Sequence, residues 1–416
     1  MRKNFILPLP PLPITLLSSK FTYEKFQYKC LTRSLLWSAL LTRISVPQRL
    51  TLMCRGGWYL LLVKRLLNLF RRNSTTQYAL WIMSQRHFTP SRHHKSPCVF
   101  TLETNHLKHI NCVKFSDDAS LLATASEDNT TKVWKINKNC SAATQVYKLQ
   151  GHISSVTSVA FHPNGLFIAT GSEDRTVKLW KIYDGSCVFT LLAHKHGGIT
   201  SVVFDSSGEH FATTSWDMTA KIWILKDDCT RPSRVSWLKG HRDIVNSFAF
   251  NNKLAATASE DKTAMVWLMK EDYSSPTCVS ILRGHTRGVS SVAFNPTNKN
   301  LLLTGGDDGA VIFWELSPDF SNMTCTATCI LKLMDPKNTW DINSITIDNS
   351  GLRFLTCSWD KTAKLWLMIF DGQKIIGCVL LSTLRHDSCV FSAAFHPNYE
   401  VALTVGLDAS AKFWEV

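Results

Sequence analysis

The sequence lacks an apolar run of the ~20 residues that a membrane-spanning helix needs. The longest candidate, WYLLLVKRLLNLF at residues 58–70, is interrupted by Lys64 and Arg65. A phosphate-binding glycine loop is also missing, and no isolated pair of acids stands outside the repeated positions described below. The sequence therefore predicts neither a membrane-spanning helix nor a nucleotide-binding or acid–base catalytic site.

Cysteine pairs with metal-ligand spacing are missing as well. The 13 Cys are scattered singly, and the nearest pair, Cys325 and Cys329, has no second pair to complete a zinc site. We therefore expect no metal and no cofactor. We also expect singly buried, reduced thiols, as in a cytoplasmic or nuclear protein.

Acidic residues are scarce in the first part of the chain. Residues 1–95 hold 16 Lys and Arg but a single acid, Glu24, which gives this stretch a net charge of +15. The remaining residues hold 30 basic and 31 acidic side chains, a net charge of −1. The basic character therefore belongs to an N-terminal extension, residues 1–95, which we expect to be poorly ordered.

Four interpretations of this extension stay open. It is basic and poor in acids, as a mitochondrial presequence is, and residues 55–72 suit a basic amphipathic anchor on a membrane surface. Its charge alone suits an arm that binds nucleic acid. We favour the fourth, a misassigned start with translation beginning at Met83, because the repeats described next would then carry only a short leader.

Internal repetition dominates residues 96–416. Seven segments end in a Trp that follows an Asp by six positions, with Trp-to-Trp spacings of 46, 43, 44, 47, 52 and 48 residues. The pairs are Asp128/Trp134, Asp174/Trp180, Asp217/Trp223, Asp261/Trp267, Asp308/Trp314, Asp360/Trp366 and Asp408/Trp414. Each unit holds four short alternating runs, such as VTSVAF, FIATGS, TVKLW and CVFTLL within residues 156–192. Because turn residues separate these runs, they predict four antiparallel strands per unit.

These units resemble the repeats of WD-repeat proteins. The resemblance covers about residues 96–416 and rests on the GH pairs at 151–152, 240–241 and 284–285 and on the S-x-D…W runs. It implies an all-β fold: a monomeric, seven-bladed β-propeller of four-stranded antiparallel blades around a central channel.

A stretch that occurs twice predicts how the ring closes. CVFTL at 187–191 is the fourth strand of a unit, and the same letters at 98–102 stand ahead of the first complete unit. The last unit stops at Val416, after its third strand. Since unpaired strand edges are avoided, we expect residues 98–102 to supply the missing outer strand of the last blade.

The resemblance also implies a buried network of His, Ser, Asp and Trp in each blade, in which the imidazole bonds both the carboxylate and the hydroxyl. The sets are His106, Ser126, Asp128 and Trp134; His152, Ser172, Asp174 and Trp180; His194, Ser215, Asp217 and Trp223; and His241, Ser259, Asp261 and Trp267. Because the set recurs in blade after blade, we interpret it as architecture rather than as a catalytic triad, and we predict no enzyme and no catalytic residue.

The later blades depart from this pattern. Gly306 and Gly406 replace the serine in blades five and seven, and Asn338 stands where blade six should have its histidine. We therefore expect these blades to be less rigid. The register of blade six, which follows the longest spacing, is the hardest to assign.

Binding residues are expected on the face where the innermost strands begin. The residue before each structural Asp should point outward there: Glu127, Glu173, Trp216, Glu260, Asp307, Trp359 and Leu407. A second ring comes from the start of the innermost strands: Asn111, Thr157, Thr200, Asn246, Ser290, Asn343 and Phe391. Aromatic side chains beside carboxylates suit Lys and Arg.

We therefore predict a scaffold or adaptor in a multiprotein complex that binds a basic peptide segment of a partner protein on this face. Packing against neighbouring blades is the alternative role of Trp216, Trp359 and Phe391. A role for the basic extension at a membrane or on nucleic acid is a second function to consider, and a substrate receptor of a ubiquitin ligase is a third. Some WD-repeat proteins that act as ubiquitin-ligase receptors carry Trp-Asp-x-Arg at the end of the third strand. No blade of this sequence has that motif.

Overall fold

The computed structural model describes residues 96–416 except 138–139, 226–230, 271–272, 274, 335–339 and 399, and except the side chains of 234–235. The basic extension, Met83 and Asn338 lie outside the described residues, so the expectations about them stay predictions. The described part of the chain forms 28 strands, and none of its residues builds a helix that could cross a membrane.

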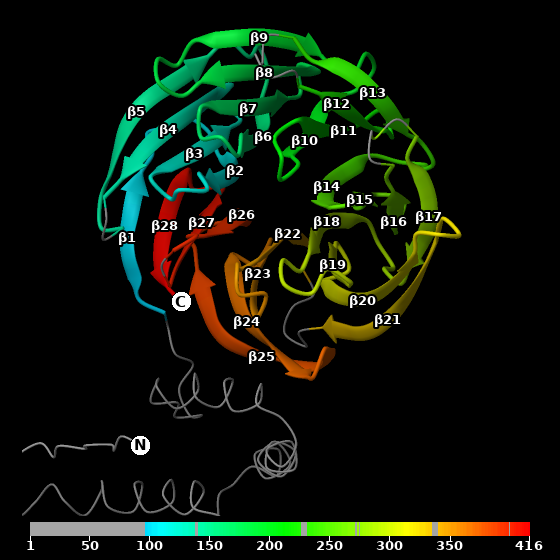
Figure 1. Cartoon of the computed structure of the whole chain (residues 1–416). Helices are drawn as coiled ribbons and strands as arrows, with labels where there is room; N and C mark the ends of the chain where they lie inside the picture. The colour runs from blue at the N-terminus through cyan, green and yellow to red at the C-terminus, as the bar shows by residue number, and fades with distance from the viewer. Residues whose placement is uncertain are drawn as a thin grey trace, which may run out of the picture. The chain divides into compact units, whose positions relative to one another are not determined.

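The strands form seven separate sheets, each of four antiparallel strands, arranged as blades around a ring (Figure 1). Blades one to four hold β2 (Ile110–Phe115), β3 (Leu121–Ser126), β4 (Thr130–Ile136) and β5 (Ala143–Gln150); β6 (Val156–Phe161), β7 (Phe167–Ser172), β8 (Thr176–Lys181) and β9 (Cys187–Leu192); β10 (Ile199–Phe204), β11 (His210–Ser215), β12 (Ala220–Ile224) and β13 (Ser233–Leu238); and β14 (Val245–Asn251), β15 (Leu254–Ser259), β16 (Thr263–Leu268) and β17 (Thr277–Arg283). Blades five to seven hold β18 (Val289–Phe294), β19 (Leu301–Gly306), β20 (Ala310–Asp319) and β21 (Thr324–Met334); β22 (Ile342–Ile347), β23 (Arg353–Ser358), β24 (Thr362–Asp371) and β25 (Lys374–Arg385); and β26 (Val390–Phe395), β27 (Val401–Gly406), β28 (Ser410–Glu415) and β1 (Cys98–Glu103). The predicted seven-bladed propeller is therefore confirmed.

Burial along the strands follows their place in the blade. In blade four the middle strands β15 and β16, LAATAS and TAMVWL, are buried at every position. They are buried on both faces because each blade packs against a neighbour on either side. The outermost strands face solvent on one side, and β5 accordingly has mostly exposed or half-buried side chains.

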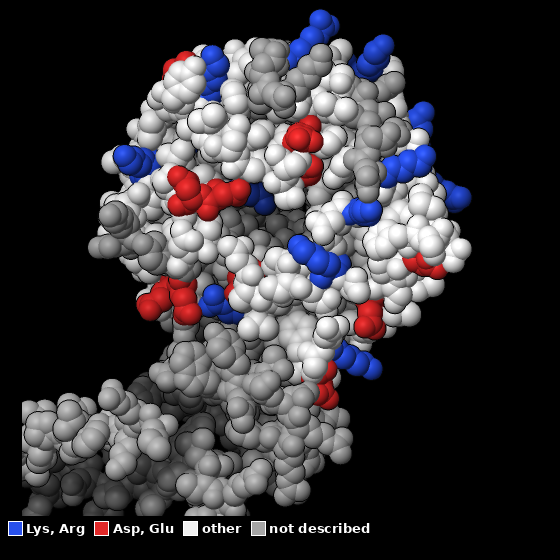
Figure 2. Space-filling model, in the orientation of Figure 1, with Lys and Arg blue, Asp and Glu red and all other residues white. Residues whose placement is uncertain are grey.

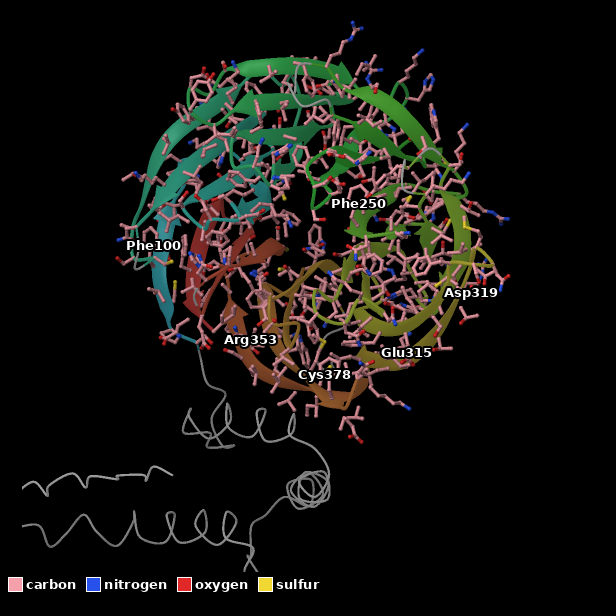
Figure 3. The ribbon with its side chains drawn as sticks, in the orientation of Figure 1. Phe100, Phe250, Glu315, Asp319, Arg353 and Cys378 are labelled. Carbon is pink, nitrogen blue, oxygen red and sulfur yellow. The ribbon has the colours of Figure 1, made fainter. Side chains whose placement is uncertain are left out.

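The ring closes between the two ends of the propeller, as predicted. β1 pairs antiparallel with β28, and Phe100, Leu102 and Glu103 lie opposite Phe413, Ala411 and Ser410. The ring of Phe100, which lies on the outer strand (Figure 3), packs on Phe413 with centroids 5.1 Å apart. β1 is thus the fourth strand of blade seven.

The unusual repeat spacings result from two long outer hairpins, β20–β21 and β24–β25. The first extends to Asp319, labelled in Figure 3, before the chain returns in β21. The register of blade six nonetheless matches that of blade five, because Trp366 lies opposite Phe354 as Trp314 lies opposite Leu302. The extra residues between these two Trp therefore leave the core of blade six unchanged.

The expectation of singly buried thiols is only partly right. All ten cysteines of the described residues are free, and Cys140, Cys325 and Cys357 are buried. The exposed ones are Cys98, Cys187, Cys278 and Cys329. They are exposed because they lie on the outermost strands β1, β9, β17 and β21, whose outer faces no other blade covers.

Candidate functional site

The turn between the second and third strand of each blade contacts the start of that blade's innermost strand. In blade one the amide of Glu127 donates to the carbonyl of His109 at 3.1 Å, and in blade six the amide of Trp359 donates to that of Asp341 at 3.2 Å. The same bond forms at Glu173, Trp216, Glu260, Asp307 and Leu407. These seven turns therefore lie on one face of the ring, which we call the top face.

A buried hydrogen-bond chain holds each turn in place. In blade one, Nδ1 of His106 lies 2.8 Å from Asp128 and Nε2 lies 2.9 Å from Oγ1 of Thr124. The indole of Trp134 donates to the same Oγ1 at 3.1 Å. The indole only donates, so Thr124 accepts from it and donates to Nε2, which leaves Nδ1–H to donate to Asp128.

The hydroxyl in this hydrogen-bond chain belongs to Thr124 and not to Ser126, so the prediction for Ser126 was wrong on this point. Ser126 instead accepts from the amide of Asp128 at 3.1 Å and donates to the carbonyl of His109 at 2.9 Å. Residues 124 and 126 point to the same side of β3, and only Thr124 contacts the imidazole. The serine ties the turn to the innermost strand, whereas the threonine links His106 to Trp134.

The same chain recurs in five further blades, where the serines Ser172, Ser215 and Ser259 bond to the backbone as Ser126 does. The sets of His, Asp, Thr and Trp are His152, Asp174, Thr170 and Trp180; His194, Asp217, Thr213 and Trp223; His241, Asp261, Thr257 and Trp267; His285, Asp308, Thr304 and Trp314; and His386, Asp408, Thr404 and Trp414.

Blades five and seven therefore keep their buried chain although Gly306 and Gly406 replace the serine. The hydroxyls belong to Thr304 and Thr404, so the loss of serine does not break the contacts between histidine and indole. Blade six differs: Trp366 donates to Thr356 at 3.1 Å, and the carboxylate of Asp360 contacts Nζ of Lys364 at 2.8 Å.

Burial and hydrogen bonding set the charges of these groups. Burial lowers the pKa of His106, although the hydrogen bond with Asp128 opposes this shift. Burial disfavours the ionised form of Asp128, but hydrogen bonds from Thr130 and His106 outweigh it and lower its pKa to about 2. A neutral imidazole thus donates to an ionised carboxylate at neutral pH. The His106 side chain is 0% exposed, which suits a structural role better than contact with a substrate.

The second predicted ring also has a structural role. Its polar members donate to the first carbonyl of the innermost strand of the next blade: Asn111 to Val156, Thr157 to Ile199, Thr200 to Val245, Asn246 to Val289, Ser290 to Ile342 and Asn343 to Val390. These bonds link blades one to seven in order. Phe391 stands at the seventh position and has no side-chain donor to offer to blade one.

Phe391 instead belongs to an aromatic group on blades six, seven and one. Its ring meets Trp359 edge-to-face, with centroids 5.7 Å apart, and lies 5.3 Å from the ring of His109. The Trp359 side chain stays 42% exposed. Trp340, in the loop before β22, is 58% exposed on the same blade, and it was missed because it stands outside the repeated Trp positions.

Trp216 lies apart from this group. It is 46% exposed on the turn of blade three, three blades from Trp359. Trp216 and Trp359 therefore share the top face but lie on blades that are not neighbours. Leu407, on the turn of blade seven, is 38% exposed.

Three carboxylates gather on the top faces of blades four to six. The carboxylates of Glu260 and Asp307 both lie against Gly288. A Cβ added to this glycine would clash with Glu260 and would lie 2.8 Å from Oδ2 of Asp307. Burial, together with the charges of Glu260 and Asp341, raises the pKa of Asp307 to about 7. Arg287 contacts Asp341 at 2.7 Å. This part of the face therefore holds more negative charge than Arg287 balances.

The acids of blades one and two have partners from their own blades. Glu127 lies 3.0 Å from Nδ1 of His109 and 3.4 Å from Nζ of Lys108. Glu173 accepts from the hydroxyl of Ser154 at 3.3 Å. All four acidic turn residues are half-buried, so they are less exposed than we expected of residues pointing outward.

Comparison with known proteins agrees with this architecture. The family described as "WD domain, G-beta repeat" matches residues 96–135, 143–181, 185–223, 232–267, 276–315, 327–366 and 378–415. The first matched segment spans β1 to β4, so each repeat joins the outer strand of one blade to three strands of the next.

A relative of known name covers little of the chain. It is the Periodic tryptophan protein 2 homolog of Schizosaccharomyces pombe, 33% identical over 75 residues. The match covers 18% of this chain and 8% of the relative, so the chain spans a small part of that protein's length. The seven matched repeats, by contrast, cover most of residues 96–416 and coincide with the seven blades, and the chain therefore belongs to the WD40 repeat family.

Proposed function

We propose that this protein is a non-enzymatic scaffold that binds a basic peptide segment of a partner protein on its top face, as part of a multiprotein complex. WD40 propellers generally bind other proteins, which supports the class of function. The observation that carries the proposal is the pair formed by the exposed Trp359 and the half-buried Phe391. Phe391 replaces the hydrogen-bonding residue found at the other six positions of its ring, so an aromatic side chain stands where the architecture favours a donor.

The charges near this pair favour a cationic ligand. Asp341, one residue after the exposed Trp340, belongs to the acidic group that also holds Glu260 and Asp307. A Lys or Arg side chain placed there gains charge-assisted hydrogen bonds, and its stem or guanidinium packs on an indole. A cation would also favour the ionised form of Asp307, whose pKa is raised to about 7 by burial and by the charges of Glu260 and Asp341.

Trp216 supplies a second contact in this proposal. It and Trp359 lie on blades three and six, so a segment that touches both crosses the middle of the top face.

We propose that the propeller acts as a monomer in the cytoplasm or nucleus. Roles through residues 1–95, or as a receptor of a ubiquitin ligase, remain alternatives that no contact among the described residues favours.

Affinity purification with mass spectrometry tests this function. The full-length protein is compared with a Trp216→Ala/Trp359→Ala variant that circular dichroism shows to be folded. A matched control is Leu166→Ala/Tyr183→Ala, which truncates side chains that are 55% and 65% exposed on turns at the opposite ends of the strands. Partners lost by the first variant and kept by the control support the proposal. Partners kept by both variants overturn it.

A further inference from the structure

A second charged region lies on the outer part of the top face, over blades two to four. Six exposed cations form it, and we call them the basic rim: Arg175, Lys195, Lys239, Arg242, Lys262 and Arg283. Figure 2 shows Lys and Arg side chains spaced along the edge of the molecule that carries β13 and β17. This region is distinct from the acidic and aromatic groups nearer the middle.

Local contacts place these cations at the top ends of their blades. Arg175 follows the structural Asp174, and its guanidinium donates to the carbonyl of Lys195 at 3.1 Å. The amide of Arg242 donates to Asp261, and Lys262 is the next residue of that turn. Arg283 ends β17 opposite Thr263, the first residue of β16.

The other blades balance such cations with carboxylates. The ion pairs are Lys108 with Glu127, Lys332 with Asp308, Lys364 with Asp360 and Lys412 with Asp387. Across the described part of the chain, no carboxylate forms an ion pair with any of the six rim cations. Asp243 lies on a loop of the rim. Its side chain accepts a hydrogen bond from the amide of Ile244 at 2.8 Å and forms no ion pair with a described rim cation. The six rim cations therefore form no ion pair with a described carboxylate, and their exposed charges can attract an anion.

An exposed indole lies within the rim. Trp237 is 36% exposed, and the ammonium groups of Lys221 and Lys239 lie 4.0 and 4.7 Å from the centre of its ring. These contacts hold two cations close together. They also occupy the ring, so Trp237 does not offer a bare surface for stacking a nucleic-acid base.

We propose that the basic rim binds an acidic peptide segment of a partner protein. Charge complementarity selects an anionic ligand. Because two ammonium groups already lie over the ring of Trp237, the rim offers no free aromatic face for a base, and this favours a peptide carboxylate over a nucleic acid. This surface goes beyond the proposed function, because its ligand has the opposite charge and its six residues are different.

Charge reversal in the full-length protein tests the rim. The probe is a fluorescent 12-residue polyglutamate peptide, with binding followed by anisotropy at low and high salt. The variant Lys262→Glu/Arg283→Glu is compared with Lys299→Glu/Lys374→Glu, which makes the same change at exposed positions near the opposite ends of the strands. Any contribution of residues 1–95 is the same in both proteins.

We expect the rim variant to bind about tenfold more weakly than the native protein, since each exposed ion pair contributes a few-fold and reversal adds repulsion. The control should differ by less than about twofold, and binding should weaken as salt rises. Equal losses in both variants overturn the proposal. A 12-nucleotide single strand that binds more tightly than the peptide, and depends more on the rim, also overturns it by assigning the rim to nucleic acid.

Discussion

The indole of Trp359 meets the ring of Phe391 edge-to-face, with the ring planes at 83°. Trp359 comes from a turn of blade six and Phe391 from the innermost strand of blade seven. Such a pair contributes about 0.5–1.5 kcal/mol. It nonetheless leaves Trp359 42% exposed, so packing alone does not account for an indole at this position.

Replacing Phe391 by asparagine separates packing from binding. Asparagine occupies the equivalent position in blades one, four and six and donates there to the next blade. In Phe391→Asn the new hydrogen bond, worth about 1 kcal/mol, offsets the lost burial. We therefore expect the unfolding temperature to stay within about 2 °C while partner binding is lost. A large drop in unfolding temperature with binding retained would show that Phe391 is a packing residue.

Removing β1 should open the ring. A chain that starts after Glu103 loses the pairing with β28, the burial of Leu102 and the packing of Phe100 on Phe413. We expect a loss of at least about 3 kcal/mol in the free energy of unfolding, measured by denaturant titration. A chain that starts at Met83 keeps β1 and is the control. Equal stability of the two truncated chains would contradict the closure.

The buried hydroxyl predicts unequal effects at two neighbouring positions. Thr124→Val leaves Nε2 of His106 and the indole N–H of Trp134 without their shared partner, which should cost about 2–4 kcal/mol. Ser126→Ala removes only bonds to the backbone and should cost about 1 kcal/mol. Denaturant titrations of both variants measure this order. The reverse order would restore the serine to the place that the sequence analysis assigned to it.

The raised pKa of Asp307 predicts an effect of pH on stability. The carboxyl ionises near pH 3.8 when unfolded and near pH 7 when folded. Between these values the folded state binds more protons, so this group's contribution to stability falls as the pH rises. Asp307→Asn removes the penalty and should stabilise the protein by about 1 kcal/mol at pH 8, a value reduced for partial exposure. The gain should vanish near pH 4. If the free energy of unfolding of the variant and of the native protein changed in parallel with pH, the raised pKa of Asp307 would be contradicted.

The sequence by itself determined the architecture, because the signals that specify it are local. Alternating residues predict strands, the turn residues separate them, and the Asp–Trp spacing repeats seven times. The CVFTL run at residues 98–102 then predicts the closure, since an unpaired strand edge is costly. The exposed turn residues Trp216 and Trp359 could be located in the same way.

Tertiary structure alone decided which groups meet. Thr124 and Ser126 share one side of a strand, so their spacing does not tell which of them contacts His106. The bonds between blades and the basic rim both bring together residues that lie tens of positions apart. Such contacts depend on the closed ring, in which seven locally similar blades acquire different neighbours.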